Sequence, residues 1–261
     1  MKINLKDKKA LIGGSSKGLG YAVAKQLAVC GATVTLASRN EALLKKNIID
    51  LNKLTGIEHN YLLVDYNQPE KYKQIIEGFF QKNIIDILVN NTQGPPAGDV
   101  FSVNENDYQK SFDLLFKNTI NTTNSAIKGM KKNNWGRIIN MTSVSVKEPL
   151  AYLALSNTIR SAVTSWGKTL SIESGQFNIT VNNILTGFFN TERLNQLNSE
   201  KAKKFNVSTD EVFDKMSEIV PLKRIGEPEE FGYLVAFLAS DYADYINGAN
   251  IPIDGGLLKS M

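Results

Sequence analysis

Short apolar runs alternate with amphipathic stretches along the whole of this 261-residue chain. The apolar runs have the length of buried strands, and the stretches between them, such as Gly18–Val29, Ala42–Leu54 and Glu70–Gln81, carry apolar residues at helical spacing. The seven expected strands are Lys9–Ile12, Thr33–Ala37, Asn60–Val64, Ile85–Asn90, Arg137–Met141, Thr180–Leu185 and Asn250–Ile253. This alternation predicts an α/β fold with a doubly wound, Rossmann-like parallel sheet and helices on both faces.

One stretch interrupts the alternation. From Gly187 to about Pro221 the chain is polar and rich in Lys and Asn, and one helix is expected over Thr209–Ile219. The stretch follows the sixth strand, so it leaves the carboxyl edge of the sheet, where ligands bind in doubly wound folds. We therefore expect residues 1–261 to form a single domain with a lid-like insertion at 187–221. A surface excursion with no role in binding is the alternative.

Composition and charge narrow the class of protein. Lys and Arg number 30 against 26 Asp and Glu, which leaves no basic footprint for nucleic acid. No apolar run approaches the ~18 residues of a membrane span, and Met1–Lys9 lacks the apolar core of a signal peptide. The single histidine and single cysteine have no metal-site spacing. We expect a soluble cytoplasmic protein that binds neither a metal, a membrane nor nucleic acid.

A glycine-rich loop follows the first expected strand and opens a helix. It reads Gly13-Gly14-Ser15-Ser16-Lys17-Gly18-Leu19-Gly20. Glycines allow a tight turn and let the backbone approach a pyrophosphate, whose charge meets the helix N-terminus. The loop therefore predicts a dinucleotide site.

The end of the second expected strand indicates which dinucleotide. An NAD site would place an acid about 20 residues after the loop, on the ribose 2′-hydroxyl. This chain has Ser38-Arg39 there instead. A guanidinium suits a 2′-phosphate, and Lys17 could supply a second cation, so NADP(H) is the expected cofactor. The alternative is that both cations are ordinary surface residues.

From about Leu5 to Gly256, the motifs together resemble the short-chain dehydrogenase/reductase family. The family's Thr-Gly-x-x-x-Gly-x-Gly motif matches the glycine loop, with Gly13 in place of threonine, and Asn90-Asn91-Thr92-Gln93-Gly94 resembles its Asn-Asn-Ala-Gly motif. The resemblance assigns cofactor contacts to a set spread along the chain: Gly14, Ser16, Lys17, Gly18, Leu19, Gly20, Ser38, Arg39, Asp65, Asn91, Gly94, Arg160, Gly187 and Thr191. Its nearest relatives look like 3-oxoacyl-carrier-protein reductases, which implies reduction of a 3-oxoacyl group or a similar small ketone.

The catalytic positions implied by the family depart from its pattern. Ser143 matches the serine that orients the carbonyl, but Ser156 stands at the position of the proton-donating tyrosine and Arg160 at that of the lysine. Leu115 replaces an asparagine that supports a water chain. A serine hydroxyl is a far weaker acid than a phenol with pKa ~10, and an arginine cannot pass a proton along.

Tyr152 is a candidate replacement for the missing phenol. It precedes Ser156 by four residues, so a helix that contains both would place their side chains on one face, where Arg160 could polarise the phenol. A packing role at the helix start is the alternative.

Two functions remain open. The first is an NADPH-dependent carbonyl reductase with altered catalytic residues, and the second is a non-catalytic NADP(H)-binding sensor or partner protein on the same scaffold. A different reaction in the same cleft is a third possibility. The resemblance also implies a homodimer or homotetramer, paired through helices at about Asp107–Lys132 and Tyr152–Glu173, with the tail Ile251–Met261 at a second interface.

Overall fold

The computed structural model describes residues 2–260, apart from the side chain of Lys204. Seven parallel strands form one sheet in the order β3-β2-β1-β4-β5-β6-β7. Their bounds are β1 Lys9–Gly13, β2 Thr33–Ser38, β3 Asn60–Leu63, β4 Ile87–Asn90, β5 Gly136–Met141, β6 Ile179–Thr186 and β7 Asn250–Ile253. All seven lie where the apolar runs predict them, with ends that differ by at most two residues.

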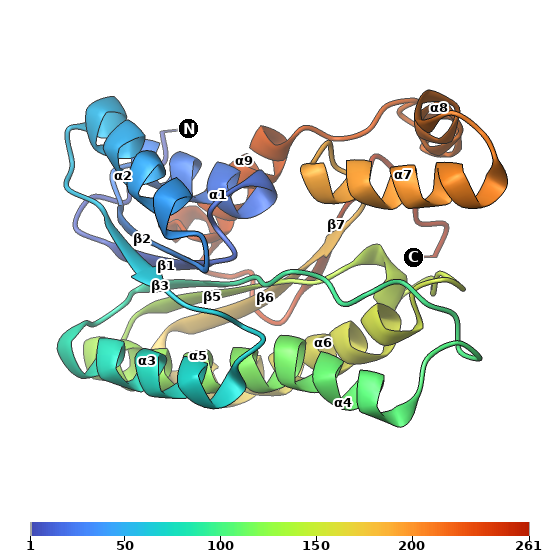
Figure 1. The fold of residues 1–261 in the computed structure, drawn as a ribbon. Coiled ribbons are helices and arrows are strands. Elements are labelled where there is room, and N and C mark those ends of the chain that lie inside the picture. Colours follow the sequence, from blue (N-terminus) through green and yellow to red (C-terminus); the bar gives the residue numbers. More distant parts are fainter. Residues whose placement is uncertain (1, 261) are drawn as a thin grey trace.

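Helices cover both faces of the sheet. Their bounds are α1 Gly18–Val29, α2 Glu41–Thr55, α3 Pro69–Lys82, α4 Glu105–Phe112, α5 Asn118–Asn133, α6 Ala154–Ser174, α7 Glu192–Phe205, α8 Thr209–Ile219 and α9 Pro228–Leu238. Figure 1 shows α1, α2 and α9 on one face and α3, α4, α5 and α6 on the other. The predicted doubly wound, single-domain fold is confirmed.

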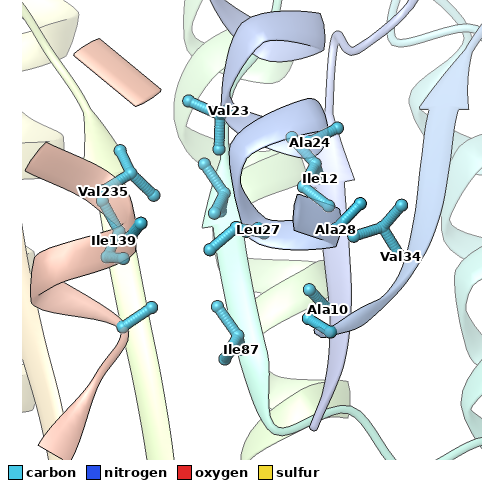
Figure 2. Packing of buried hydrophobic residues seen from close by; sticks show 14 of the residues in the cluster. Ala10, Ile12, Val23, Ala24, Leu27, Ala28, Val34, Ile87, Ile139 and Val235 are labelled. Carbon is cyan, nitrogen blue, oxygen red and sulfur yellow. The ribbon is translucent and has the colours of Figure 1, made fainter. Parts of the chain in front are cut away.

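The core on the α1 face explains why the first strand and helix hold together. Val23, Ala24, Leu27 and Ala28 of α1 pack against apolar residues of β1, β2, β4, β5 and α9, as Figure 2 shows. These α1 side chains are almost completely removed from water, which stabilises the fold by roughly 25 cal/mol per Å² of apolar surface. The start of α1 is therefore fixed against the end of β1.

Two helices, rather than the single one expected, occupy the polar 187–221 stretch. The α8 bounds match the predicted helix, but α7 was missed because most of its residues are polar. In the structure its few apolar residues, with those of α8, form a small separate cluster around Ala202, Val212, Met216 and Ile225. The helices lie side by side, apart from the two helical layers (Figure 1).

The order of strands places a topological switch between β1 and β4, where the chain leaves the β3 edge and returns to the centre. Doubly wound sheets bind ligands at such a point, beyond the carboxyl ends of the strands. The glycine loop follows β1 and Asn91 follows β4, so both border this crevice. None of the described helices is long and apolar enough to cross a membrane.

Candidate active site

The glycine loop adopts a conformation that needs glycine. Gly14 and Gly18 have φ of +54° and +58°, in the left-handed region. A Cβ on Gly20 would lie 2.4 Å from the carbonyl oxygen of Gly14, and one on Gly14 would lie 2.7 Å from Asn91 Nδ2. Side chains are thus excluded from the turn, which leaves the backbone exposed to a ligand.

The N-terminus of α1 has no capping side chain of its own. The helix begins at Gly18, Lys17 before it is extended, and the first turn contains no acidic residue. Leu19 points the other way and packs against the core. Unpaired N–H groups and the positive end of the helix dipole make this terminus suited to an anion, so the loop fits a dinucleotide pyrophosphate.

The end of β2 is tied to the glycine loop through serines. Ser38 Oγ donates to Ser16 Oγ at 3.0 Å, and Asn47 Nδ2 on α2 donates to the Ser16 carbonyl at 2.8 Å. Arg39, the next residue, is exposed and forms no salt bridge within residues 2–260. This guanidinium is therefore available beside the loop, as the sequence predicts for a 2′-phosphate site.

Lys17, the second predicted phosphate ligand, already has a partner. Its ammonium forms an ion pair with Glu192 in the first turn of α7. Thr191 caps α7 by accepting from the Leu194 N–H at 3.3 Å, and its methyl group would lie 3.6 Å from a Cβ on Gly18. The start of α7 thus lies directly against the glycine loop.

Residues after β3 and β4 complete the crevice. Asp65 accepts from the backbone and side chain of Asn67, both at 3.0 Å, and Asn91 Nδ2 donates to the Gly13 carbonyl at 3.0 Å. Gly94 lies in the loop after β4, with nothing within 4 Å of the position of a Cβ. These assigned residues border the same crevice as the glycine loop.

Gly187 joins the end of β6 to the end of β7. Its N–H donates to the Ile253 carbonyl at 3.0 Å, and a Cβ there would lie 2.6 Å from the Asp254 Cα. This close approach requires glycine, and it turns the chain from β6 toward Thr191 and α7. Gly187 therefore has a packing role between the ends of β6 and β7, in addition to the cofactor contact that the resemblance assigns to it.

Ser143 lies two residues after β5, at the start of a short 3₁₀ helix over Val144–Val146. Its Oγ accepts from the backbone N–H of Ser145 at 3.1 Å. This bond orients the oxygen and leaves the hydroxyl proton free to be donated. Such a hydroxyl can orient a carbonyl group at the edge of the sheet.

Ser156 and Arg160 lie one turn apart on α6. Arg160 donates from Nε to Ser156 Oγ at 3.2 Å and from Nη1 to the Met141 carbonyl at the end of β5, at 2.7 Å. Removal from water lowers the pKa of Arg160 to about 10, so it stays positively charged at neutral pH. No salt bridge is formed by Arg160 with the described residues. The structure thus places one positive charge at the end of β5, the strand that Ser143 follows by two residues.

Tyr152 does not share a helical face with Ser156, because α6 begins only at Ala154. The residue lies in the preceding turn, where its carbonyl accepts from the Gly98 N–H at 2.9 Å. Lys201 of α7 lies over its ring, 5.8 Å from the centroid. Burial raises the pKa of the phenol, whereas a nearby guanidinium would lower it. The shared helical face that the Tyr152 hypothesis assumed is therefore absent from the structure.

Leu115, at the position of the family's asparagine, is buried in a π-helical turn at Asp113–Lys117 between α4 and α5. It offers no polar side chain toward Arg160. Its carbonyl accepts from Thr119 Oγ1 at 2.6 Å. The water-chain support implied by the resemblance is absent at this position.

A family model described as enoyl-(acyl carrier protein) reductase matches residues 14–258, nearly the whole chain. The chain is a short-chain dehydrogenase/reductase. This short-chain dehydrogenase/reductase is 31% identical over 260 residues to NADPH-dependent reductase BacG of Bacillus subtilis, covering 97% of this chain and 98% of the relative. It is 28% identical over 254 residues to the 3-oxoacyl-[acyl-carrier-protein] reductase FabG of Chlamydia muridarum, covering 97% and 98%.

Among solved structures, the short-chain dehydrogenase/reductase resembles L-sorbose reductase from Gluconobacter frateurii, crystallised with NADPH and L-sorbose. The TM-score is 0.93 at 28% identity, and the match covers all of both chains. The resemblance to 3-oxoacyl-carrier-protein reductases stated from the motifs is confirmed by these comparisons.

Three residues of this short-chain dehydrogenase/reductase site were not predicted from the sequence. The buried Tyr66 hydroxyl accepts from the Gly14 N–H at 3.2 Å, Asn47 supports Ser16, and Glu192 pairs with Lys17. Tyr66 directly follows Asp65, so its position after β3 was a usable signal. Nothing in the local sequence links Asn47 or Glu192 to the loop.

Proposed function

We propose that the chain is an NADPH-dependent reductase of a small carbonyl compound, such as a 3-oxoacyl group or a similar ketone. One observation supports this function above all. The N-terminus of α1 has no side-chain cap and follows a glycine-rich loop, and the Ser143 hydroxyl lies at the same edge of the sheet. The first feature suits a pyrophosphate and the second a carbonyl oxygen. The relatives, which are reductases that use or bind NADPH, support the same activity.

The cofactor contacts are proposed as follows. The loop glycines and the start of α1 hold the pyrophosphate, and Arg39 with Ser16 and Ser38 holds the 2′-phosphate. Asp65, Asn91 and Gly94 border the adenosine half, whereas Gly187, Thr191 and Arg160 border the nicotinamide half. When bound, the cofactor supplies a hydride to the carbonyl carbon.

The remaining chemistry falls to Ser143, Ser156 and Arg160. Ser143 donates its hydroxyl proton in a hydrogen bond to the carbonyl oxygen, and the Arg160 charge stabilises the negative charge that develops there. Ser156 orients the guanidinium by accepting from Nε. Ser156 is too weak an acid, and Arg160 keeps its proton in order to stabilise the negative charge, so the proton that completes the alcohol comes from water. A hydride from the bound cofactor and this one proton would together convert the ketone to the alcohol.

The 187–221 stretch is proposed to act as a lid. Contacts from α7 to three separate loops support this: Glu192 to Lys17, Arg193 Nη2 to the Pro95 carbonyl at 3.2 Å, and Lys201 to the Tyr152 ring. Each loop follows a different strand, so α7 spans the edge of the sheet where substrate would enter.

We also propose a cytoplasmic homodimer or homotetramer. An apolar side chain on a helix that the family resemblance pairs between subunits, Ile172 of α6, is 72% exposed. Light scattering on the purified protein gives the subunit number directly. A monomeric mass across a hundredfold range of concentration contradicts this part of the proposal.

The first test is separate titration of the purified protein with NADPH and NADH, followed by a panel of small carbonyl compounds. The proposed function requires tight NADPH binding, weak NADH binding and turnover that Ser143→Ala removes. No binding of either nucleotide contradicts it.

One observation favours a second candidate, a non-catalytic NADP(H) sensor or partner protein. Helix α6 contains no tyrosine beside Ser156 and Arg160. These two residues stand at the positions of the family's tyrosine and lysine. Tight NADPH binding without turnover of any carbonyl in the panel, for both the wild type and Ser143→Ala, selects this candidate.

A further inference from the structure

Four asparagines form a row of hydrogen bonds across the sheet. They are Asn90, Asn140, Asn183 and Asn250, which face one another in register on β4, β5, β6 and β7. Each Nδ2 donates to the next Oδ1, at 2.8 Å, 2.9 Å and 2.8 Å. The two inner members are fully buried.

The row touches α6 at one place. The second N–H of Asn183 Nδ2 donates to the Thr164 carbonyl of α6 at 3.2 Å. Beside it, Gly167 lets the helix approach the row, because a Cβ there would lie 2.6 Å from Asn183 Oδ1 and 2.8 Å from Asn140 Nδ2. The height and the position of α6 along the sheet are therefore set by polar contacts.

The same contacts lead to Arg160. Thr164 Oγ1 donates to the Arg160 carbonyl at 2.8 Å, and Arg160 Nη1 donates to the carbonyl of Met141, the residue that follows Asn140. A closed ring thus runs from Asn140 through Asn183, Thr164, Arg160 and Met141 back to Asn140. Moving α6 relative to β5 breaks this ring and displaces the guanidinium.

Apolar side chains at these positions could also fill the space, but they would not specify one position. Apolar contacts are non-directional, whereas a buried amide that loses its hydrogen-bond partner destabilises the fold, so any sliding of the helix is penalised. A fully satisfied amide row therefore defines one placement of α6.

We propose that Asn183 is a positioning residue for Arg160, acting through the Thr164 carbonyl and the closed ring with Asn140 and Met141. The proposal rests on the proposed reductase function, in which Arg160 stabilises charge on the carbonyl oxygen. Asn183 itself is a fully buried residue of β6.

The test compares Asn183→Leu with Asn250→Leu. Both changes remove one amide from the row, but only the first removes the bond to α6. Asn183→Leu is expected to lower kcat about tenfold or more, as small misplacements of catalytic groups do. Binding of 2′,5′-ADP, which reports the adenosine half of the site, is expected to stay unchanged. Asn250→Leu keeps kcat within about twofold, because Asn250 is exposed and lies at the end of the row.

A double-mutant cycle separates positioning from general damage. In an Arg160→Met background, Asn183→Leu adds no further loss of kcat or change in the fluorescence of bound NADPH if it acts through Arg160. If the fold-loss in kcat of the double variant is the product of the two single fold-losses, the proposal is overturned. An unchanged kcat in Asn183→Leu alone also overturns it.

A last measurement needs no turnover, so it distinguishes failure of the reductase function from failure of this proposal. The Arg160 Nε–H donates to Ser156, and its hydrogen exchange can be followed by NMR on the full-length protein. Exchange at least tenfold faster in Asn183→Leu than in Asn250→Leu supports positioning, whether or not any carbonyl is reduced. Equal exchange in both variants overturns it.

Discussion

Arg160 donates from Nε to the hydroxyl of Ser156, one turn earlier on α6, at 3.2 Å. The two side chains replace a lysine and a tyrosine in the family pattern, yet they still form a hydrogen-bonded pair at the edge of the sheet. Ser156 cannot deliver a proton at neutral pH, and Arg160 remains charged. The pair therefore holds a fixed positive charge where the family has a titrating phenol.

The dependence of rate on pH follows from this charge. Burial lowers the pKa of Arg160 to about 10, so the guanidinium is protonated at neutral pH and loses its proton as the pH rises through about 10. We expect kcat/KM with NADPH to be flat from about pH 6 to 9 and to fall above that range. A change in kcat/KM around pH 7 would show that the reaction depends on another titrating group.

Tyr152→Phe is expected to keep turnover within about twofold, because Tyr152 precedes α6, and the Arg160 guanidinium donates to Ser156 and Met141 instead. Steady-state kinetics with the best carbonyl of the panel provide the measurement, and Ser143→Ala serves as the control that must lose activity. A loss of about a hundredfold in Tyr152→Phe would instead restore this residue as the proton donor.

Arg39→Ala is expected to weaken NADPH binding about 10- to 100-fold, because charge-assisted hydrogen bonds contribute about 1.5–3 kcal/mol. Binding of NADH, which has no 2′-phosphate, should not change. Lys17→Ala should cost less, because Lys17 is already paired with Glu192 and both are exposed. Calorimetric titration of both variants with both nucleotides checks the order. Equal losses for NADPH and NADH in Arg39→Ala would contradict this assignment.

Gly20→Ala is expected to abolish detectable NADPH binding and to lower the thermal stability. The added Cβ would lie 2.4 Å from the Gly14 carbonyl oxygen, so the loop must move. Gly78→Ala is the matched control. That glycine lies on the exposed side of α3 with nothing within 4 Å of a Cβ, and alanine there should stabilise the protein by about 0.4–1 kcal/mol. Thermal melts with and without NADPH measure both effects, and a Gly20→Ala protein that binds NADPH normally would contradict the fit of the loop.

Much of the fold could be predicted because its signals are local. The strand of Asn250–Ile253 and the helices Gly18–Val29 and Thr209–Ile219 have the predicted bounds, since apolar spacing within a segment reports which face is buried. The glycine loop could also be predicted, because the left-handed φ at Gly14 and Gly18 restricts the residue type at those positions. The polar helix Glu192–Phe205 was missed because its stability depends on packing against α8.

The sequence by itself determined the doubly wound sheet, the glycine loop and the replacement of the family's tyrosine and lysine by Ser156 and Arg160. Only the tertiary structure decided that Tyr152 stands outside α6, that Lys17 pairs with Glu192, and that Asn183 bonds to α6. The physical reason is the distance along the chain. Periodicity and backbone conformation act within a few residues, whereas these contacts join residues brought together only when the sheet and its helices pack.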